Sequence, residues 1–121
     1  MKNKISKSLL NRIKLANEYI KFAVKHQIWG EDYGTPSSSW VSVKEFIAPI
    51  KISPTGRTVS LKYKLPYDGD EIRNEVFYRN KFDGEGEIRA LINEVIRGIK
   101  KGAKEEGWTL THTGTKLKKK K

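Results

Sequence analysis

The stretch TVSLKYKL, residues 58–65, alternates between apolar and polar side chains without a break. A period of two is that of a β-strand, in which successive side chains point to opposite faces of the sheet. Its apolar members are Val59, Leu61, Tyr63 and Leu65. The pattern predicts a strand that places these four side chains on a hydrophobic core and leaves Lys62 and Lys64 on the other face.

Turn-forming residues flank this strand on both sides. The sequence SPTGR, residues 53–57, fits a type I turn with proline second and glycine fourth. On the other side, Asp68-Gly69 is a dipeptide favoured in tight hairpins, because both positions tolerate a positive φ. Two short connections predict that strands at residues 40–53 and 71–82 pair with the central strand in a three-stranded antiparallel meander.

The two flanking strands carry less regular patterns. In the first, the apolar parity changes between Val43 and Phe46, which predicts a bulge or bend near residues 44–46. Pro49 lacks a backbone donor and predicts an edge position. In the last strand, one parity is mostly apolar and is expected to face the core: Ile72, Val76, Tyr78 and Phe82.

A helix is predicted on each side of this region. Over residues 5–28, apolar side chains recur every three or four positions, with Ser6 as N-cap and Gly30 as the stop. The expected stripe is Leu9, Ile13, Ala16, Ile20, Val24 and Ile28. Over residues 85–106, acidic residues at the start and lysines near the end match the helix dipole. Gly98 and Gly102 predict close backbone packing there.

The ends of the helices carry further signals. Gly107 followed by Trp108 is typical of a helix stop with an apolar residue that folds back. Trp29, Trp40 and Trp108 all stand at element boundaries, where tryptophan commonly closes the end of a small core.

The predicted fold is α+β. Residues 1–112 are expected to form a single domain of α-β-β-β-α order, with an N-terminal amphipathic helix, the meander and a C-terminal helix. The sequence THTGTKLKKKK contains few apolar residues, so residues 113–121 are predicted to be a disordered, flexible polylysine tail.

Composition excludes several functional classes. The chain has no cysteine, which excludes disulfides, thiolate metal sites and cysteine nucleophiles. The first 14 residues contain no uninterrupted apolar run, so neither a signal peptide nor a membrane contact is expected. A cytoplasmic location is the resulting prediction.

The net charge of +11 is concentrated at the two ends of the chain. Residues 1–30 carry +6 and residues 108–121 carry +5, while the part between is neutral overall. This excess favours a polyanionic partner, DNA or RNA.

Three sets of basic residues are candidates for phosphate contact. The first is a sheet face on which an aromatic ring could stack on a base: Trp40, Lys62, Lys64, Arg73, Phe77, Arg79 and Lys81. The second is the tail: Lys116, Lys118, Lys119, Lys120 and Lys121. The third is the outer face of the first helix, which carries Lys7, Lys14, Lys21 and Lys25. Each set could equally be an ordinary solvated surface or, for the tail, a solubilising end.

The sequence gives little support for catalysis. His26 and His112 are the only histidines and have no second metal ligand at a suitable spacing. The acidic residues Asp68, Asp70 and Glu71 are explained by a hairpin turn. We therefore expect no enzymatic activity, no cofactor and no metal.

The resulting functional hypothesis is a non-enzymatic nucleic-acid-binding accessory protein of a phage or mobile element. Two alternatives stay open. One is a protein-binding inhibitor or adaptor of the counter-defence type, acting on a host nucleic-acid enzyme. The other is a structural assembly subunit. Sequence preference, strandedness and oligomeric state are not determined by the sequence.

Overall fold

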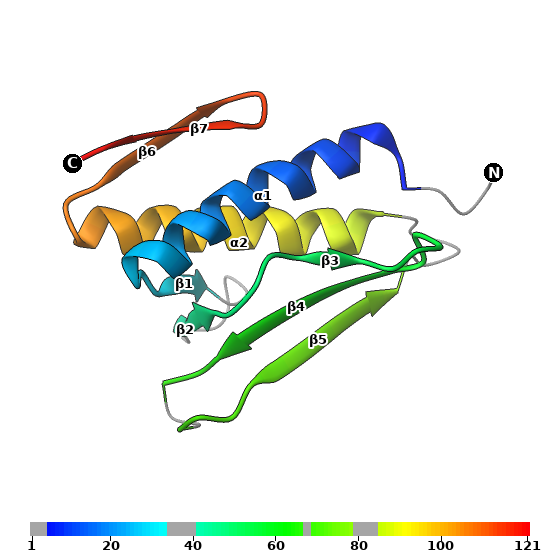
Figure 1. Ribbon diagram of the computed structural model, residues 1–121, viewed down its shortest axis with the longest axis horizontal. Coiled ribbons are helices and arrows are strands. Elements are labelled where there is room, and N and C mark those ends of the chain that lie inside the picture. The colour runs from blue at the N-terminus through cyan, green and yellow to red at the C-terminus, as the bar shows by residue number, and fades with distance from the viewer. Residues whose placement is uncertain (1–4, 34–40, 67–68, 79–84) are drawn as a thin grey trace.

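The computed structural model describes residues 5–33, 41–66, 69–78 and 85–121 and has an α+β fold. Figure 1 shows three layers, with the helices α1 (Lys7–His26) and α2 (Gly86–Glu105) side by side between a sheet and a hairpin. The sheet comprises β1 (Gly30–Tyr33), β2 (Val41–Phe46), β3 (Lys51–Ile52), β4 (Thr58–Lys64) and β5 (Arg73–Tyr78). The hairpin comprises β6 (Thr109–Thr113) and β7 (Lys116–Lys120). The predicted fold class is confirmed.

Strand β4 is the centre of the sheet and carries its core face. Its apolar side chains Val59, Leu61 and Tyr63, and Leu65 just beyond, are all buried. The turn before it is also as predicted, since the N–H of Gly56 donates to the carbonyl of Ser53 at 2.9 Å. Alternation over a single strand was therefore sufficient to assign its inward face.

The predicted first strand of the meander is divided into β2 and β3. Both pair with β4, at Lys64 and Tyr63 for β2 and at Ser60 and Val59 for β3. The break lies just after the predicted bend, where the Asn17 side chain accepts from the N–H of Ile50 at 2.7 Å and donates to its carbonyl at 3.3 Å. A helix side chain thus replaces the ladder partners of this residue.

Strand β1 was not predicted, because residues 30–39 are rich in Gly, Pro and Ser. Its first residue, Gly30, was expected to stop α1, but α1 ends earlier, at Gln27 in a left-handed conformation with φ of 55°. Gly30 instead starts β1, where a Cβ would lie 2.5 Å from the Phe46 ring. Gly30 pairs with Lys44 of β2 at this point, and its missing side chain leaves room for the Phe46 ring.

Helix α1 buries a wider face than the predicted stripe. Ser6 caps it as expected, accepting from the N–H of Leu9 at 3.2 Å. Leu15, Tyr19 and Phe22 are buried in addition to the stripe, whereas Val24 is 46% exposed. The helix contacts α2 on one side and the hairpin on another, so more than one stripe of side chains is covered.

The two helices run parallel, held by polar contacts along their seam. Ser6 donates to the carboxylate of Glu85, Arg89 donates to Ser8 at 3.2 Å, and Arg12 donates to Asn93 at 2.6 Å. Helix α2 ends as predicted: Gly107 has φ of 90°, and the N–H of Trp108 donates to the carbonyl of Ala103 at 2.9 Å. Neither helix is long and apolar enough to cross a membrane, among the residues described.

The prediction for the faces of β5 is wrong. Its pairing with β4 sets Val76 opposite Ser60 and Phe77 opposite Val59. Because directly opposite residues share a face, Ile72, Val76 and Tyr78 lie on the open face with Lys62, and Phe77 lies toward the helices. Phe82 lies outside the described residues. Both the even-numbered and the odd-numbered residues of β5 include apolar side chains, so alternation alone assigned the wrong face to the core.

The prediction of a disordered tail is also wrong. The predicted boundary at residue 113 falls at the end of β6, and residues 116–120 form β7, paired with β6 from Thr109–Lys120 to Thr113–Lys116. The hairpin is stabilised because Leu110 is buried and Leu117 is partly buried against the helices. Two well-placed apolar residues therefore order a segment whose composition resembles that of a disordered chain.

Candidate nucleic-acid interface

The inner face of the β6–β7 hairpin is fixed to the helices by aromatic contacts. The Trp108 ring packs against Phe22, with centroids 5.0 Å apart at an interplanar angle of 84°, and against His26 at 4.7 Å. This confirms the prediction that Trp108 closes one end of the core. Two tail lysines also lie on this side, with the Lys119 ammonium 6.0 Å from the Phe22 ring and that of Lys121 5.0 Å from the Trp108 ring.

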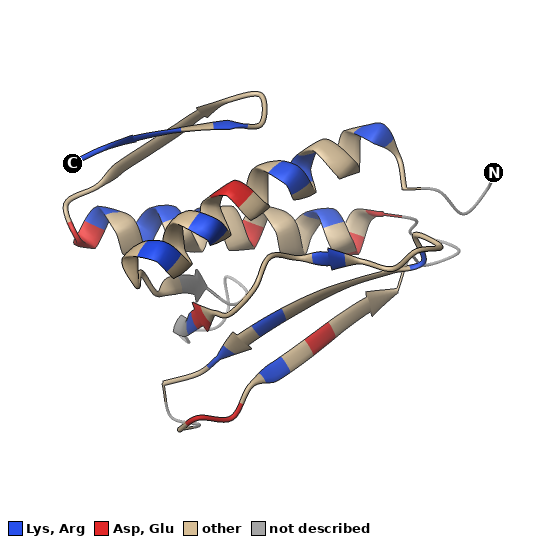
Figure 2. Ribbon diagram, viewed as in Figure 1, with Lys and Arg blue, Asp and Glu red and all other residues tan. Residues whose placement is uncertain are grey.

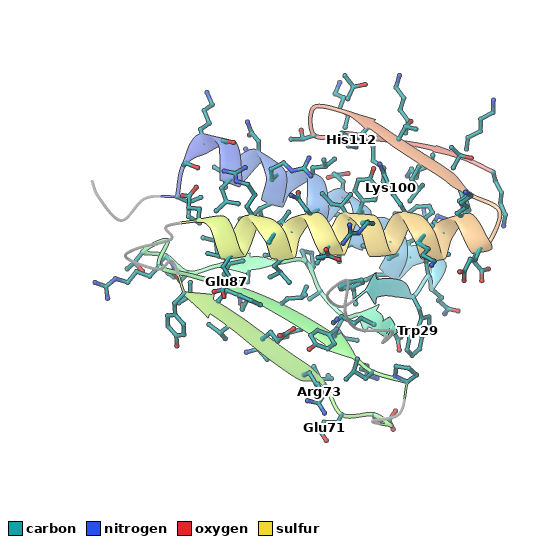
Figure 3. The ribbon with its side chains drawn as sticks, turned by 180° about the vertical axis from the view of Figure 1, so that it is seen from behind. Trp29, Glu71, Arg73, Glu87, Lys100 and His112 are labelled. Atoms are coloured by element: carbon teal, nitrogen blue, oxygen red, sulfur yellow. The ribbon has the colours of Figure 1, made fainter. Side chains whose placement is uncertain are left out.

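A hydrogen bond joins the hairpin to the middle of α1. The Tyr19 hydroxyl lies 3.1 Å from Nδ1 of His112. Burial, followed by the positive charges of Lys100 and Arg12, lowers the pKa of His112. Burial raises the pKa of Tyr19. Figure 3 shows His112 and Lys100 between the hairpin and α2. Both partners of this hydrogen bond, Tyr19 and His112, are therefore neutral at pH 7 when the hairpin packs on the helices.

Acidification is expected to loosen the hairpin. Because the pKa of His112 is lower in the folded state, the unfolded state binds more protons, and stability falls as the pH drops below about 6.5. The protection factors of the β6 and β7 amides, which are NMR exchange rates taken relative to the intrinsic rate at each pH, should therefore fall as the pH is lowered from 7.5 to 5. The variant His112→Gln should remove most of this pH dependence, while His26→Gln serves as the control. An unchanged fall of the protection factors in His112→Gln would contradict the assignment.

The outer face of the hairpin is polar and regular. The strand register sets three threonines opposite three lysines, as Thr109–Lys120, Thr111–Lys118 and Thr113–Lys116, and all six side chains are exposed. We call Lys116, Lys118 and Lys120 the lysine row. The predicted tail set is thereby divided, because Lys119 and Lys121 lie on the inner side.

Basic residues of both helices extend the positive surface around the lysine row. On α1, Lys14 and Lys21 line a shallow concavity with Thr115 of the hairpin turn and with Glu18, which pairs with Lys21 at 3.8 Å. On α2, a second concavity is lined by Arg97, Lys100, Lys101, Lys104 and Glu105. Figure 2 shows Lys and Arg along α1, β7 and the second half of α2. Together with the lysine row, these basic residues form what we call the cationic surface.

The predicted sheet-face set is not brought together. Lys62 and Lys64 lie on the open face, with Lys64 opposite Glu45. Arg73 is opposite Tyr63 and Phe77 opposite Val59, so both lie on the other face, and Phe77 packs against the core. Trp40, Arg79 and Lys81 lie outside the described residues. The open face thus retains two of its predicted cations and gains an exposed ring, Tyr78, that the sequence had placed in the core.

The threonines of β6 and the basic end of α2 were missed as parts of the site. The alternation of Thr109, Thr111 and Thr113 was available as a signal, but it acquires meaning only once β7 is recognised as its partner. No group of three metal-ligating side chains comes together in the part of the chain that the structure describes.

Comparison of the chain with protein-family models, with curated proteins and with solved structures found no match.

Proposed function

We propose that the protein binds DNA or RNA through the cationic surface, without catalysing a reaction. The observation that carries this proposal is the lysine row, three exposed lysines on one strand of an ordered hairpin. A cytoplasmic location is part of the same proposal.

The spacing of the lysine row suits a phosphate backbone. Alternate residues of a strand are about 6.8 Å apart. Successive phosphates of one nucleic-acid strand are separated by a comparable distance, because the backbone winds around the axis as it advances by about 3.4 Å per step. The three lysines can therefore meet successive phosphates. Each threonine opposite them adds a hydroxyl that can donate to a phosphate oxygen.

The ordered hairpin also lowers the cost of binding. A flexible tail must lose backbone freedom when it contacts phosphates, whereas β7 is already held by Leu117 and by its pairing with β6. Lys14 and Lys21 of α1 line a concavity with Thr115, the residue before the lysine row, and can add further phosphate contacts. The contacts are to phosphates and carry no base-specific readout.

The test is the salt dependence of binding, measured by fluorescence anisotropy with single- and double-stranded DNA and RNA. Replacing the lysine row by glutamine (K116Q, K118Q and K120Q together) should reduce the log–log salt slope by about 3 for duplex DNA and by about 2 for a single strand. Point variants are preferable to deletion of residues 113–121, which would remove Leu117 from the core.

A matched control lies on the opposite side of the molecule. Lys51, Lys62 and Lys64 belong to the open sheet face, so K51Q, K62Q and K64Q together change the net charge equally at a distance from the hairpin. This triple variant should retain most of the slope. An equal loss in both triple variants would show that net charge alone drives binding, and absence of salt-sensitive affinity for all four probes would contradict the proposed function.

A further inference from the structure

Three large apolar side chains are exposed together along β5. Ile72 is 52% exposed, Val76 42% and Tyr78 69%. They lie on one face, because alternate residues of a strand share a face. Single exposed apolar residues are common, but a row along an edge strand is a surface at which another chain commonly pairs.

Strand β5 is such an edge. It pairs with β4 from Tyr63–Arg73 to Thr58–Tyr78, and with no other strand among the residues described. Its second edge therefore presents backbone donors and acceptors that a further strand can satisfy. Figure 1 shows β5 at the side of the molecule farthest from the β6–β7 hairpin.

We propose that two copies of the chain pair through their β5 edges, antiparallel, with Asn74 of one copy opposite Asn74 of the other. The two sheets then join into one. The Arg73 side chain of each copy lies opposite Glu75 of the other, and Ile72 lies opposite Val76.

Symmetry limits the possible registers. A two-fold axis that joins two antiparallel edges into one sheet is perpendicular to that sheet. Two residues that lie opposite each other across the axis therefore point to the same face, and their numbers are both even or both odd. Three registers lie near the middle of β5: they place Asn74, Glu75 or Val76 next to the axis, opposite the same residue of the other copy. A register centred on Glu75 sets two carboxylates against each other, and one centred on Val76 sets Glu75 against Phe77. Of these three, only the Asn74 register forms two pairs of opposite charge, which are favourable cross-strand neighbours.

Edge pairing is favoured over packing of the two open faces against each other. The open face also carries Lys51, Lys62 and Lys64, and face-to-face packing would take these ammonium groups out of water. Edge pairing leaves them solvated while Ile72 and Val76 of the two copies cover one another. The charge of β5 supports the same choice, since residues 70–78 carry a net charge of −2 in a chain of +11.

The axis perpendicular to the sheet places both helix layers on the same side of the joined sheet. The cationic surfaces of the two copies, beyond those helices, then face the same way. Self-association does not require nucleic acid, so it can be tested separately from the proposed function. A dimer would hold two cationic surfaces for one polyanion and raise the avidity of binding.

Sedimentation equilibrium of the wild-type chain tests the pairing. A six-residue edge contact is small compared with a standard interface, so we expect a dimer that dissociates on dilution between about 1 mM and about 1 μM. A monomer throughout this range would overturn the proposal.

Charge exchange tests the register. Arg73→Glu alone and Glu75→Arg alone set like charges opposite each other twice, and each should raise the dimer dissociation constant at least about tenfold. The double variant R73E/E75R restores opposite charges and should return the constant to within about threefold of wild type. Single variants that dimerise like wild type, or a double variant that stays monomeric, would overturn this register.

Two further variants separate pairing from folding. The Tyr63 hydroxyl donates to Glu75 at 2.8 Å, so Tyr63→Phe removes this bond without a change of charge and should leave dimerisation unaltered. Val76→Lys changes a side chain on the open face and should weaken the dimer at least about tenfold with the helical circular dichroism unchanged. A Val76→Lys variant that dimerises like wild type would overturn the proposal.

Discussion

The substitution Gly102→Ala is expected to destabilise the protein by more than about 3 kcal/mol or to prevent folding. A Cβ at this position would overlap the backbone oxygen of Trp29 and lie 3.1 Å from its carbonyl carbon. These are backbone atoms just before β1, so no rotamer change can relieve the clash. The effect opposes helix propensity, which favours alanine over glycine inside a helix by about 1 kcal/mol.

Urea denaturation followed by circular dichroism provides the measurement. The matched control is Gly86→Ala, because Gly86 is the exposed first residue of the same helix. This variant should be neutral or slightly more stable than wild type. A Gly102→Ala protein as stable as Gly86→Ala would show that α2 does not approach Trp29 as closely as described.

Leu61→Ala is expected to lower the free energy of unfolding by about 2–5 kcal/mol. Leu61 is 1% exposed at the centre of β4 and lines an existing cavity beneath α2, which its truncation would enlarge. The matched control is Ile72→Ala, which removes a side chain of similar size from the open face and should change stability by less than about 0.5 kcal/mol.

The comparison between these two variants tests the register of β5. Alternation in the sequence predicts that both side chains are buried, whereas the pairing with β4 places them on opposite faces. Urea denaturation at low protein concentration, where the chain is monomeric, measures both. Equal losses would support the sequence pattern and contradict the register.

The parts of the fold that the sequence predicted depend on short-range signals. The inward face of β4 follows from alternation, and the ends of the two helices at Ser6 and Gly107 follow from capping chemistry that involves only neighbouring residues. The close approach at Gly102 was also predictable, because glycine is unfavourable inside a helix unless it makes room for a neighbour.

The parts that were missed depend on partners far along the chain. The face of β5 is decided by its pairing with β4 across a connection of eight residues. The hairpin β6–β7 is ordered by the surface of α1, almost 100 residues earlier. One signal did exist: Tyr19 and Phe22 lie outside the predicted stripe of α1, and a helix with so wide an apolar face is covered on two sides.

The candidate site was predicted in part. The tail lysines were identified from charge alone, but charge does not distinguish the lysine row from Lys119, which lies over the Phe22 ring. The predicted sheet-face set was wrong for the same reason as the predicted faces of β5. The alternation of the sequence placed Arg73 and Phe77 on the open face, whereas the pairing with β4 places them on the other one.

The bond between Tyr19 and His112 has a consequence for biosynthesis. The two residues are 93 positions apart, so the partner of Tyr19 is synthesised 93 residues later. At a translation rate of about 5–20 residues per second, α1 waits about 5–20 s for β6 and β7 to be synthesised. During this interval Phe22 lacks Trp108, and the nascent chain exposes an aromatic surface that a chaperone or a neighbouring nascent chain can bind. The contact between α1 and the hairpin therefore forms only after β6 and β7 have been synthesised and have left the ribosome.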